Sequence, residues 1–520
     1  MKANEVNVSK EKLVFAKNND NIHDLKLDTK PMGYFKDAFY RFKKNKASIT
    51  ATFIIAFLVL FAIVVPFLTP YTVEYNDINF AYALPKSQLF YDLNLGVWDG
   101  CKEKEAKAES FYREYAKGLE TGHNSVRNQE YVVANVKNEV TMKNEQIFIF
   151  DYDTYQAKGV IFKNLDEAEY VKLQEYQDKT GIQVIYPITD RNLRPQLSTD
   201  NLDANYWYAT NNTPSSTKLV YNNKGEAVFN NIYLPYSGND GYTSTVRVEG
   251  DEKLYDYAYK NTTGYEVRVL YYEYYIFYHT EILKDGIETP CFAFGTTNIG
   301  KDILTCLGSG ARFSFILAII VASVNLFVGA IYGAIEGYYG GKIDLIMERV
   351  CDVLSAIPSM IVITLLKHNF KESPQVLILF ISFFLTGWIG MAGRTRMQFY
   401  RFKNQEYVFA ARTLGAKDTR IMFKHIFPNA IGTLITSCVL VIPGVIFSET
   451  SLTYLGIINL DTGNLTSVGT LLAKGQGYLV NYPHMILFPS VFISLLMLSF
   501  NLFGNGLRDA FNPSLRGADE

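Results

Sequence analysis

The sequence has 520 residues, of which 48% are hydrophobic and 20% are charged, and its formal net charge is −2. This length would suit about three or four soluble domains, but the apolar residues are gathered in long uncharged runs on either side of a very polar middle. The small net charge excludes the clearly basic composition expected of a nucleic-acid-binding domain. The pattern predicts a composite chain with membrane-spanning and soluble parts.

The N-terminal tail, residues 1–47, is polar, and residues 48–69 form the first long apolar run. This run has no charged residue and is about long enough to cross a ~30 Å hydrocarbon core as a helix. Its late start favours a signal anchor over a cleaved secretory signal. The positive-inside rule places the tail in the cytoplasm, because the tail carries Lys36, Arg41, Lys43, Lys44 and Lys46.

Residues 70–290 would then begin outside the cytoplasm, and they are crowded with Tyr, Asn, Asp and Glu. Runs such as 265–282 favour strands, and the stretch near 102–120 favours a helix. We expect an extracytoplasmic inserted domain that is mostly β. Its tyrosines could stack on a ligand, but strand packing or a biased residue pool accounts for them better.

The five cysteines contain no CxxC pair and no metal-ligand spacing, so neither a metal site nor a disulfide framework is predicted. At most, Cys101 and Cys291 could pair.

Residues 291–507 are predicted to be a core with five further spans. Together with the first run they give about six transmembrane helices, and an even number returns the tail 508–520 to the cytoplasm. A kink is expected at Pro358, and the basic loop 394–424 is expected on the cytoplasmic side. The further apolar runs are 313–335, 353–366, 375–392, 430–448 and 484–506.

Two patterns suggest chemistry but lack a residue that the chemistry requires. Residues 295–302 have the Gly and Lys spacing of a phosphate-binding loop, but Asp302 stands where Ser or Thr must hold Mg²⁺. Residues 151–155 begin like a calcium loop but lack its glycine and closing Glu. The histidines are scattered, so no catalytic residue is predicted and the chain is not expected to be an enzyme.

The cytoplasmic stretch 404–432 is the most informative one. A short helix from Glu406 to Leu414, a turn at Gly415 and a second helix up to Pro428 are predicted. Two helices joined by a glycine bend would form a rigid knob that suits a groove on a soluble partner. An amphipathic loop lying on anionic lipid is the alternative.

The sequence of this stretch, EYVFAARTLGAKDTRIMFKHIFPN, resembles the EAA loop of bacterial ATP-binding-cassette (ABC) importer permeases, and specifically the C-type subunit of the dipeptide and oligopeptide permease family. The resemblance rests on Ala410, Ala411, Gly415 and Pro428, while Phe409 stands at the position of the family's Glu. The resemblance continues, in order, before the first span and in 294–314, 333–360, 449–457 and 505–517. Thr297 and Lys301 depart from the usual Asp and Arg of the second of these stretches, and the insert has no counterpart.

The resemblance implies the type I ABC importer permease fold in a bacterial cell membrane. It implies partners: a paralogous B-type permease, two ATPase subunits held by the coupling loop (394–429, with its contacts in 404–430), and an extracytoplasmic binding protein that delivers peptide. This chain would bind no cofactor, because ATP and Mg²⁺ belong to the ATPase subunits. The expected coupling residues are Glu406, Ala410, Ala411, Arg412, Gly415, Arg420, His425 and Pro428.

Polar groups within spans are candidates for the translocation pathway, because they are costly to expose to lipid. Asn325, Glu336 and Glu449 are the candidates. Interhelical hydrogen bonding would explain the asparagine, and an interfacial position would explain the two glutamates. Import of nickel or a glycoside is an alternative within the class, and a membrane-anchored surface receptor is an alternative outside it.

Overall fold

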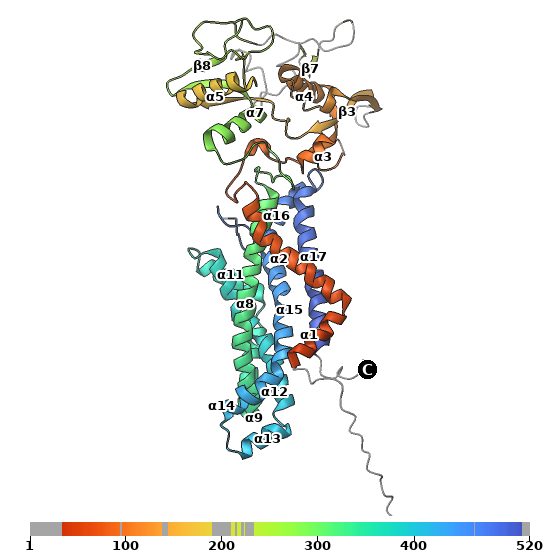
Figure 1. The fold of residues 1–520 in the computed structure, drawn as a ribbon, viewed down its shortest axis with the longest axis vertical. Coiled ribbons are helices and arrows are strands. Elements are labelled where there is room, and N and C mark those ends of the chain that lie inside the picture. Colours follow the sequence, from red (N-terminus) through yellow and green to blue (C-terminus); the bar gives the residue numbers. More distant parts are fainter. Residues whose placement is uncertain are drawn as a thin grey trace, which may run out of the picture.

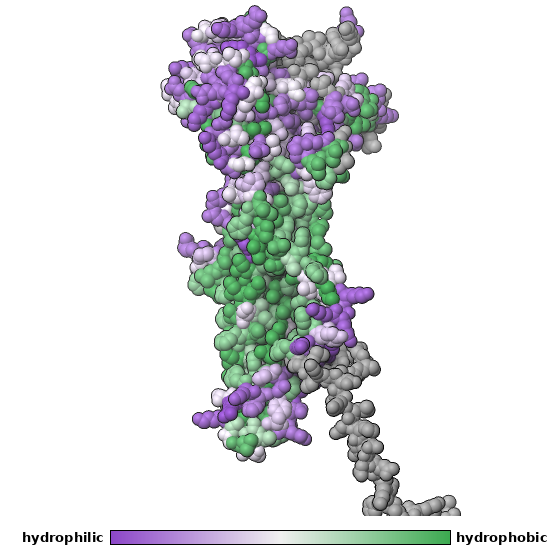
Figure 2. Space-filling model, viewed as in Figure 1, coloured by the Kyte–Doolittle hydropathy of each residue, from purple (hydrophilic) through white to green (hydrophobic). Residues whose placement is uncertain are grey.

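The structure is a computed structural model. It describes residues 34–93, 96–137, 144–189, 210–213, 216–219, 223, 233–461 and 463–511. Figure 1 shows an elongated molecule in which a bundle of helices carries a separate domain at one end and short helices at the other. We call the described part of 70–290 the head, and we call 404–428 the knob. Figure 2 shows a broad hydrophobic surface over the bundle below a mainly hydrophilic head.

Within the described residues, five helical spans are long and apolar enough to cross a membrane. The prediction of about six spans holds if the bent pair α9 (Gly341–Ser355) and α10 (Ser359–Asn369) counts as one. The two helices meet at 70°, and Pro358 lies at the break. The five spans are α2 (Lys46–Leu68), α8 (Ile303–Tyr339), α11 with α12 (Gln375–Gly387 and Ile389–Phe402), Asp418–Tyr454 including α15 (Phe427–Tyr454), and α17 (His484–Phe511).

Glycines allow the central helix α8 to pack closely on α12. Gly329, Gly333 and Gly337 recur every fourth residue and therefore share one face of α8. A Cβ atom on Gly333 would lie 2.1 Å from the carbonyl oxygen of Ala392 on α12. Small residues at such spacing let transmembrane helices approach each other. The helix α1 (Tyr34–Lys44) packs at the other side of the bundle, against α17.

The head combines strands with helices, so the expectation of a mostly β domain is only partly met. Three small antiparallel sheets have the orders β1-β3-β2, β4-β9-β5 with β8 on β9, and β6-β7. The strands are β1 (Cys101–Lys107), β2 (Val132–Lys137), β3 (Asn144–Asp153), β4 (Val160–Leu165), β5 (Ile185–Tyr186), β6 (Thr210–Thr213), β7 (Ser216–Leu219), β8 (Ala258–Lys260) and β9 (Tyr265–Leu270). The helices are α3 (Gln88–Asp92), α4 (Ala108–Thr121), α5 (Glu167–Thr180) and α7 (Tyr271–Phe277).

Buried tyrosines form much of the core of the head. Tyr155, Tyr170 and Tyr257 are almost completely buried, and Tyr170 stacks on Tyr265 at 4.2 Å between ring centroids. The packing of these rings agrees with the interpretation of the tyrosines as core residues of the head. The pairing considered for Cys101 with Cys291 is absent, because both are free thiols in the described structure.

The head also rests directly on the bundle. Tyr82 stacks on Tyr482, which precedes α17, at 4.5 Å between ring centroids. The indole of Trp98 donates a hydrogen bond to the carbonyl of Ala293 at 2.5 Å, and its ring lies 5.9 Å from that of Phe488 on α17. These contacts fix the head relative to the end of α17.

One carboxyl group in the head should make stability depend on pH. Burial raises the pKa of Glu273 above its ordinary value, so the protonated form is favoured in the folded state. The stabilisation from that protonated form is complete below the unfolded-state pKa and is lost as the pH rises through the folded-state pKa. Glu273→Gln should therefore raise the melting temperature at pH 7.5 more than at pH 4.5. A thermal unfolding series in detergent over this range, with wild type beside the variant, would show it; an equal shift at both pH values would contradict it.

Candidate coupling and translocation sites

The knob has the predicted helix, bend and second helix. The helix α13 runs from Glu406 to Thr413. Gly415 follows with φ of +79°, a left-handed conformation that suits glycine, and the amide of Ala416 donates to the carbonyl of Ala411 across the bend at 3.1 Å. The chain then re-enters helix at α14 (Asp418–Arg420).

The knob is fixed to the bundle by an apolar cluster and by one tyrosine. Val408, Ile421 and Ile426 are fully buried in a cluster with residues of α8 and α12. The hydroxyl of Tyr338, near the end of α8, donates to Asp418 at 2.6 Å and accepts from Arg412 at 3.4 Å. The knob is therefore attached to α8 as well as to the helix that follows.

Pro428 does not end the second helix as predicted; the helix continues through it into the membrane. A π-helical turn, Ile421–Ile426, precedes Pro428, and the amide of Phe427 donates to Met422 five residues back. Pro428 occupies the first turn of α15, where its missing N–H is not needed. The knob and α15 thus form one continuous helical stretch, Asp418–Tyr454.

The outer surface of the knob carries several large apolar side chains among its basic residues. Leu414, beside the bend, is 87% exposed, and Tyr407, Phe409 and Phe423 are also exposed. Exposed apolar side chains of this size beside basic residues are typical of a protein-protein contact. Ala411 is nearly buried, whereas the other expected coupling residues are exposed or half-buried on the same knob: Glu406, Ala410, Arg412, Gly415, Arg420, His425 and Pro428.

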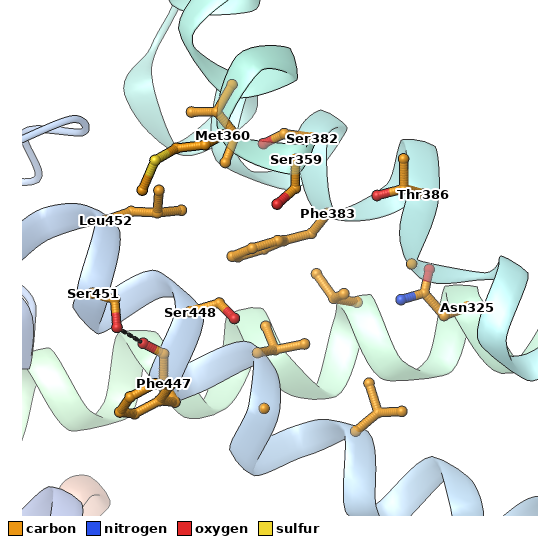
Figure 3. Close-up of a pocket in the computed structure, with 16 residues that line it drawn as sticks. Asn325, Ser359, Met360, Ser382, Phe383, Thr386, Phe447, Ser448, Ser451 and Leu452 are labelled. Carbon is orange, nitrogen blue, oxygen red and sulfur yellow. Dashed lines mark hydrogen bonds between the residues drawn. The ribbon is translucent and has the colours of Figure 1, made fainter. Parts of the chain in front are cut away.

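A cavity of about 610 Å³ lies in the bundle among α8, α10, α11 and α15. Figure 3 shows side chains from these helices around it, with Asn325 at one side and Phe383 reaching inward. None of its lining residues is charged. They are Val321, Asn325, Ser359, Met360, Ile363, Ser382, Phe383, Thr386, Gly387, Val441, Gly444, Val445, Phe447, Ser448, Ser451 and Leu452.

Of the three predicted pathway residues, only Asn325 lines this cavity. Its side chain is buried, and its Oδ1 has no hydrogen-bond partner among the described residues. Gly387 on α11 leaves room for it, since a Cβ there would lie 2.4 Å from the Asn325 Nδ2. A buried carbonyl oxygen without a partner is costly, so it is suited to accept a hydrogen bond from a passing solute.

Glu336 and Glu449 are buried within the bundle and lie outside the lining of this cavity. Glu449 on α15 accepts a hydrogen bond of 2.7 Å from Ser314 on α8, which joins the two helices. Glu336 lies 3.5 Å from Arg396 on α12, which also contacts Asp344 at 2.6 Å. Both glutamates therefore connect helices in this structure.

The stretch that resembles a phosphate-binding loop has a different role here. Residues 296–302 form a tight hairpin in which Thr297 accepts from the Lys301 amide. Asp302 then caps α8 by accepting from the amide of Thr305 at 2.8 Å. In this structure the Asp302 carboxylate therefore serves as a helix cap.

Sequence reasoning missed most of the polar lining of the cavity. Ser359, Thr386 and Ser448 face it in Figure 3, yet serine and threonine in an apolar run usually bond their own helix and give no signal. Ser451 does this, donating to Phe447 at 2.8 Å. Only the three-dimensional juxtaposition of α10, α11 and α15 brings these hydroxyls together.

Two family models match the chain on either side of the head. One, described as a binding-protein-dependent transport system inner membrane component, matches residues 326–517. The other, described as the N-terminal TM domain of oligopeptide transport permease C, matches residues 33–85. The matched stretches contain the first span, most of the remaining bundle and the knob.

Known proteins show the same likeness. The oligopeptide transport system permease protein OppC of Bacillus subtilis is 42% identical over 223 residues, which are 43% of this chain and 72% of that protein. The dipeptide transport system permease protein DppC of the same species is 38% identical over 224 residues, which are 43% of this chain and 69% of that protein. An inward-facing structure of the MetNI methionine ABC transporter is similar over 40% of this chain and 96% of that chain, with 13% identity and a TM-score of 0.33.

The knob carries the EAA-like residues, the bundle provides the spans, and the sequence similarity covers both sides of the insert. The chain is a member of the dipeptide and oligopeptide permease family of ABC transporters.

Proposed function

We propose that this chain is the membrane-spanning permease subunit of an importer of dipeptides or oligopeptides, and that ATP hydrolysis by partner subunits drives it through the knob. The observation that carries the proposal is the continuity of the knob with α15. This helix also lines the cavity through Gly444, Ser448 and Ser451. Movement of the knob would therefore displace one wall of the cavity directly, as coupling requires.

The proposed assembly contains a paralogous B-type permease, two ATPase subunits and an extracytoplasmic binding protein. The exposed apolar tip of the knob at Leu414 supports the ATPase contact. ATP and Mg²⁺ would be bound by those partners, and the chemistry of hydrolysis would be theirs. This chain would contribute part of the translocation pathway and the knob whose movement displaces α15.

We propose that the head lies outside a bacterial plasma membrane and that both termini lie in the cytoplasm. The basic helix α1, with Arg41, Lys43 and Lys44, and the basic knob lie toward the same end of the bundle, opposite the head. The positive-inside rule supports this orientation. The inserted domain, 70–290, would then be the first part of the transporter to meet an incoming binding protein.

The chemistry of the cavity favours a peptide over a metal ion. A peptide offers amide N–H and C=O groups, and Asn325, Ser359 and Ser448 can hydrogen-bond to them without charge. A nickel ion would need imidazole, thiolate or carboxylate ligands, and the described lining includes none. A glycoside would suit the same hydroxyl groups and remains the second candidate. A surface receptor would need only one anchor, and the knob would then have no role.

The proposal can be tested by uptake into proteoliposomes that contain the complete assembly. ATP supplied on the knob side should drive accumulation of a radiolabelled oligopeptide delivered by the binding protein, and unlabelled peptide should compete with it. A glycoside or nickel that accumulates instead, with no peptide uptake, would reject the peptide assignment while keeping the permease.

A further inference from the structure

A second pocket, of about 380 Å³, lies at the knob end of the bundle among α12, α15 and α17. Arg394 and Arg401 on α12 and Arg508 on α17 contribute to its wall. The remaining lining residues are polar or apolar but uncharged: Met397, Gln398, Thr433, Thr436, Ser437, Leu440 and Phe511. Three positive charges thus line one pocket without an acidic residue among its lining.

Among the residues that the structure describes, these three arginines lack the carboxylate partners that a neighbouring arginine has. No ion pair joins Arg394, Arg401 or Arg508 to a carboxylate in the described part of the chain, whereas the neighbouring Arg396 contacts Asp344, Glu336 and Glu348. Like charges gathered in one pocket repel, so an anion that enters the pocket would stabilise the arrangement. Arginine presents a planar fork of donors that matches a phosphate group.

The pocket also offers apolar contact and lies at the knob end of the bundle, where the proposed orientation places the cytoplasmic lipid headgroups. Leu440 and Met397 lie on the membrane-spanning helices α15 and α12, and Phe511 closes α17. Basic pockets between helices at the cytoplasmic end of a bundle suit anionic lipid headgroups. We propose that this pocket binds the phosphate of an anionic phospholipid, with its acyl chains along the apolar surface of the bundle.

This inference does not depend on which solute is imported. Two other anions share the chemistry of a phosphate headgroup: inorganic phosphate from the cytoplasm and the carboxylate of a peptide. Inorganic phosphate has no apolar part, and neither of these anions brings two long acyl chains to the apolar side chains beside the arginines, so the lipid fits more of the pocket.

The test is lipid binding to the full chain in its assembly, purified in mild detergent and delipidated. Native mass spectrometry would follow titration with phosphatidylglycerol or with phosphatidylcholine of the same acyl chains. Wild type should bind phosphatidylglycerol about tenfold more tightly or better, since a charge-assisted hydrogen bond is worth that much. The double variant Arg394→Gln with Arg508→Gln should bind phosphatidylglycerol no more tightly than phosphatidylcholine. The double variant Arg394→Lys with Arg508→Lys should recover part of the affinity for phosphatidylglycerol.

The matched control is Arg349→Gln, because Arg349 is an exposed arginine on α9 that lies outside the pocket. It should leave the lipid preference unchanged. If the double variant fails to fold, Ser437→Glu offers a second route, since it introduces a negative charge beside the intact arginines. Phosphatidylglycerol affinity that is equal in wild type and in Ser437→Glu would overturn the proposal. So would displacement of the lipid by millimolar inorganic phosphate or by a short peptide.

Discussion

Replacing Leu414 with aspartate should uncouple the transporter while the bundle stays folded. Leu414 is 87% exposed beside the bend of the knob and contacts no core cluster, so its replacement has little to disturb in the isolated chain. A charge at the centre of an apolar interface costs about 2 kcal/mol or more, which is about a 30-fold loss of affinity. ATPase subunits should therefore dissociate from the permease, and ATP-driven uptake should fall in proportion.

Titration of purified ATPase subunits onto the permease in nanodiscs would measure this loss. Val480→Asp is a matched control, because Val480 is 93% exposed and lies at the head end of the bundle. The control should bind ATPase subunits as wild type does. If Leu414→Asp bound them equally well, the knob would not be the contact.

Replacing Gly333 with leucine should destabilise the bundle itself. A Cβ at this position would lie 2.1 Å from a backbone carbonyl oxygen of α12, which cannot rotate away. The two helices must separate, and Gly329 and Gly337 would lose their close contacts along the same face. Overpacking of this kind typically costs about 1–3 kcal/mol and occasionally more, so we expect poor recovery of monodisperse protein and a clear drop in melting temperature.

The control for this prediction is Gly393→Leu. Gly393 lies on α12, and a Cβ there would meet no atom within 4 Å. Its replacement should leave the melting temperature within a few degrees of wild type. Equal effects of the two substitutions would show that helix propensity, and not the α8–α12 contact, determines the outcome.

The spans were predictable because a long uncharged apolar run is typical of a transmembrane helix and of little else. Their ends were less predictable. The apolar run 313–335 covers only the middle of α8, which begins at Ile303. The ten residues before the run mix polar and apolar types, so hydropathy does not mark them as part of the span. Pro428 was expected to end a helix, yet a π-helical turn before it lets the helix continue. A proline in the first turn and a proline after the last turn look alike in a sequence.

The coupling site was more predictable than the translocation site. The knob is local in sequence, so its helix, bend and helix follow from residues 404–428. The cavity is built from helices far apart in the chain, and among its lining residues only Asn325 gives a signal as a lone polar residue in a span. Glu449 gave the same signal, but its partner Ser314 is 135 residues away. No pattern near Glu449 could show that this carboxylate joins two helices.

The most direct test of the central claim is to purify the tagged chain in mild detergent from its native membranes and to identify the proteins retained with it. We predict a second, homologous permease and two ATPase subunits, and the ATPase subunits should be lost when Gly415 is replaced by a bulky residue that cannot adopt the positive φ of the bend. Recovery of the chain alone, or with unrelated surface proteins, would contradict the coupling role of the knob and would favour a surface receptor that acts through the head.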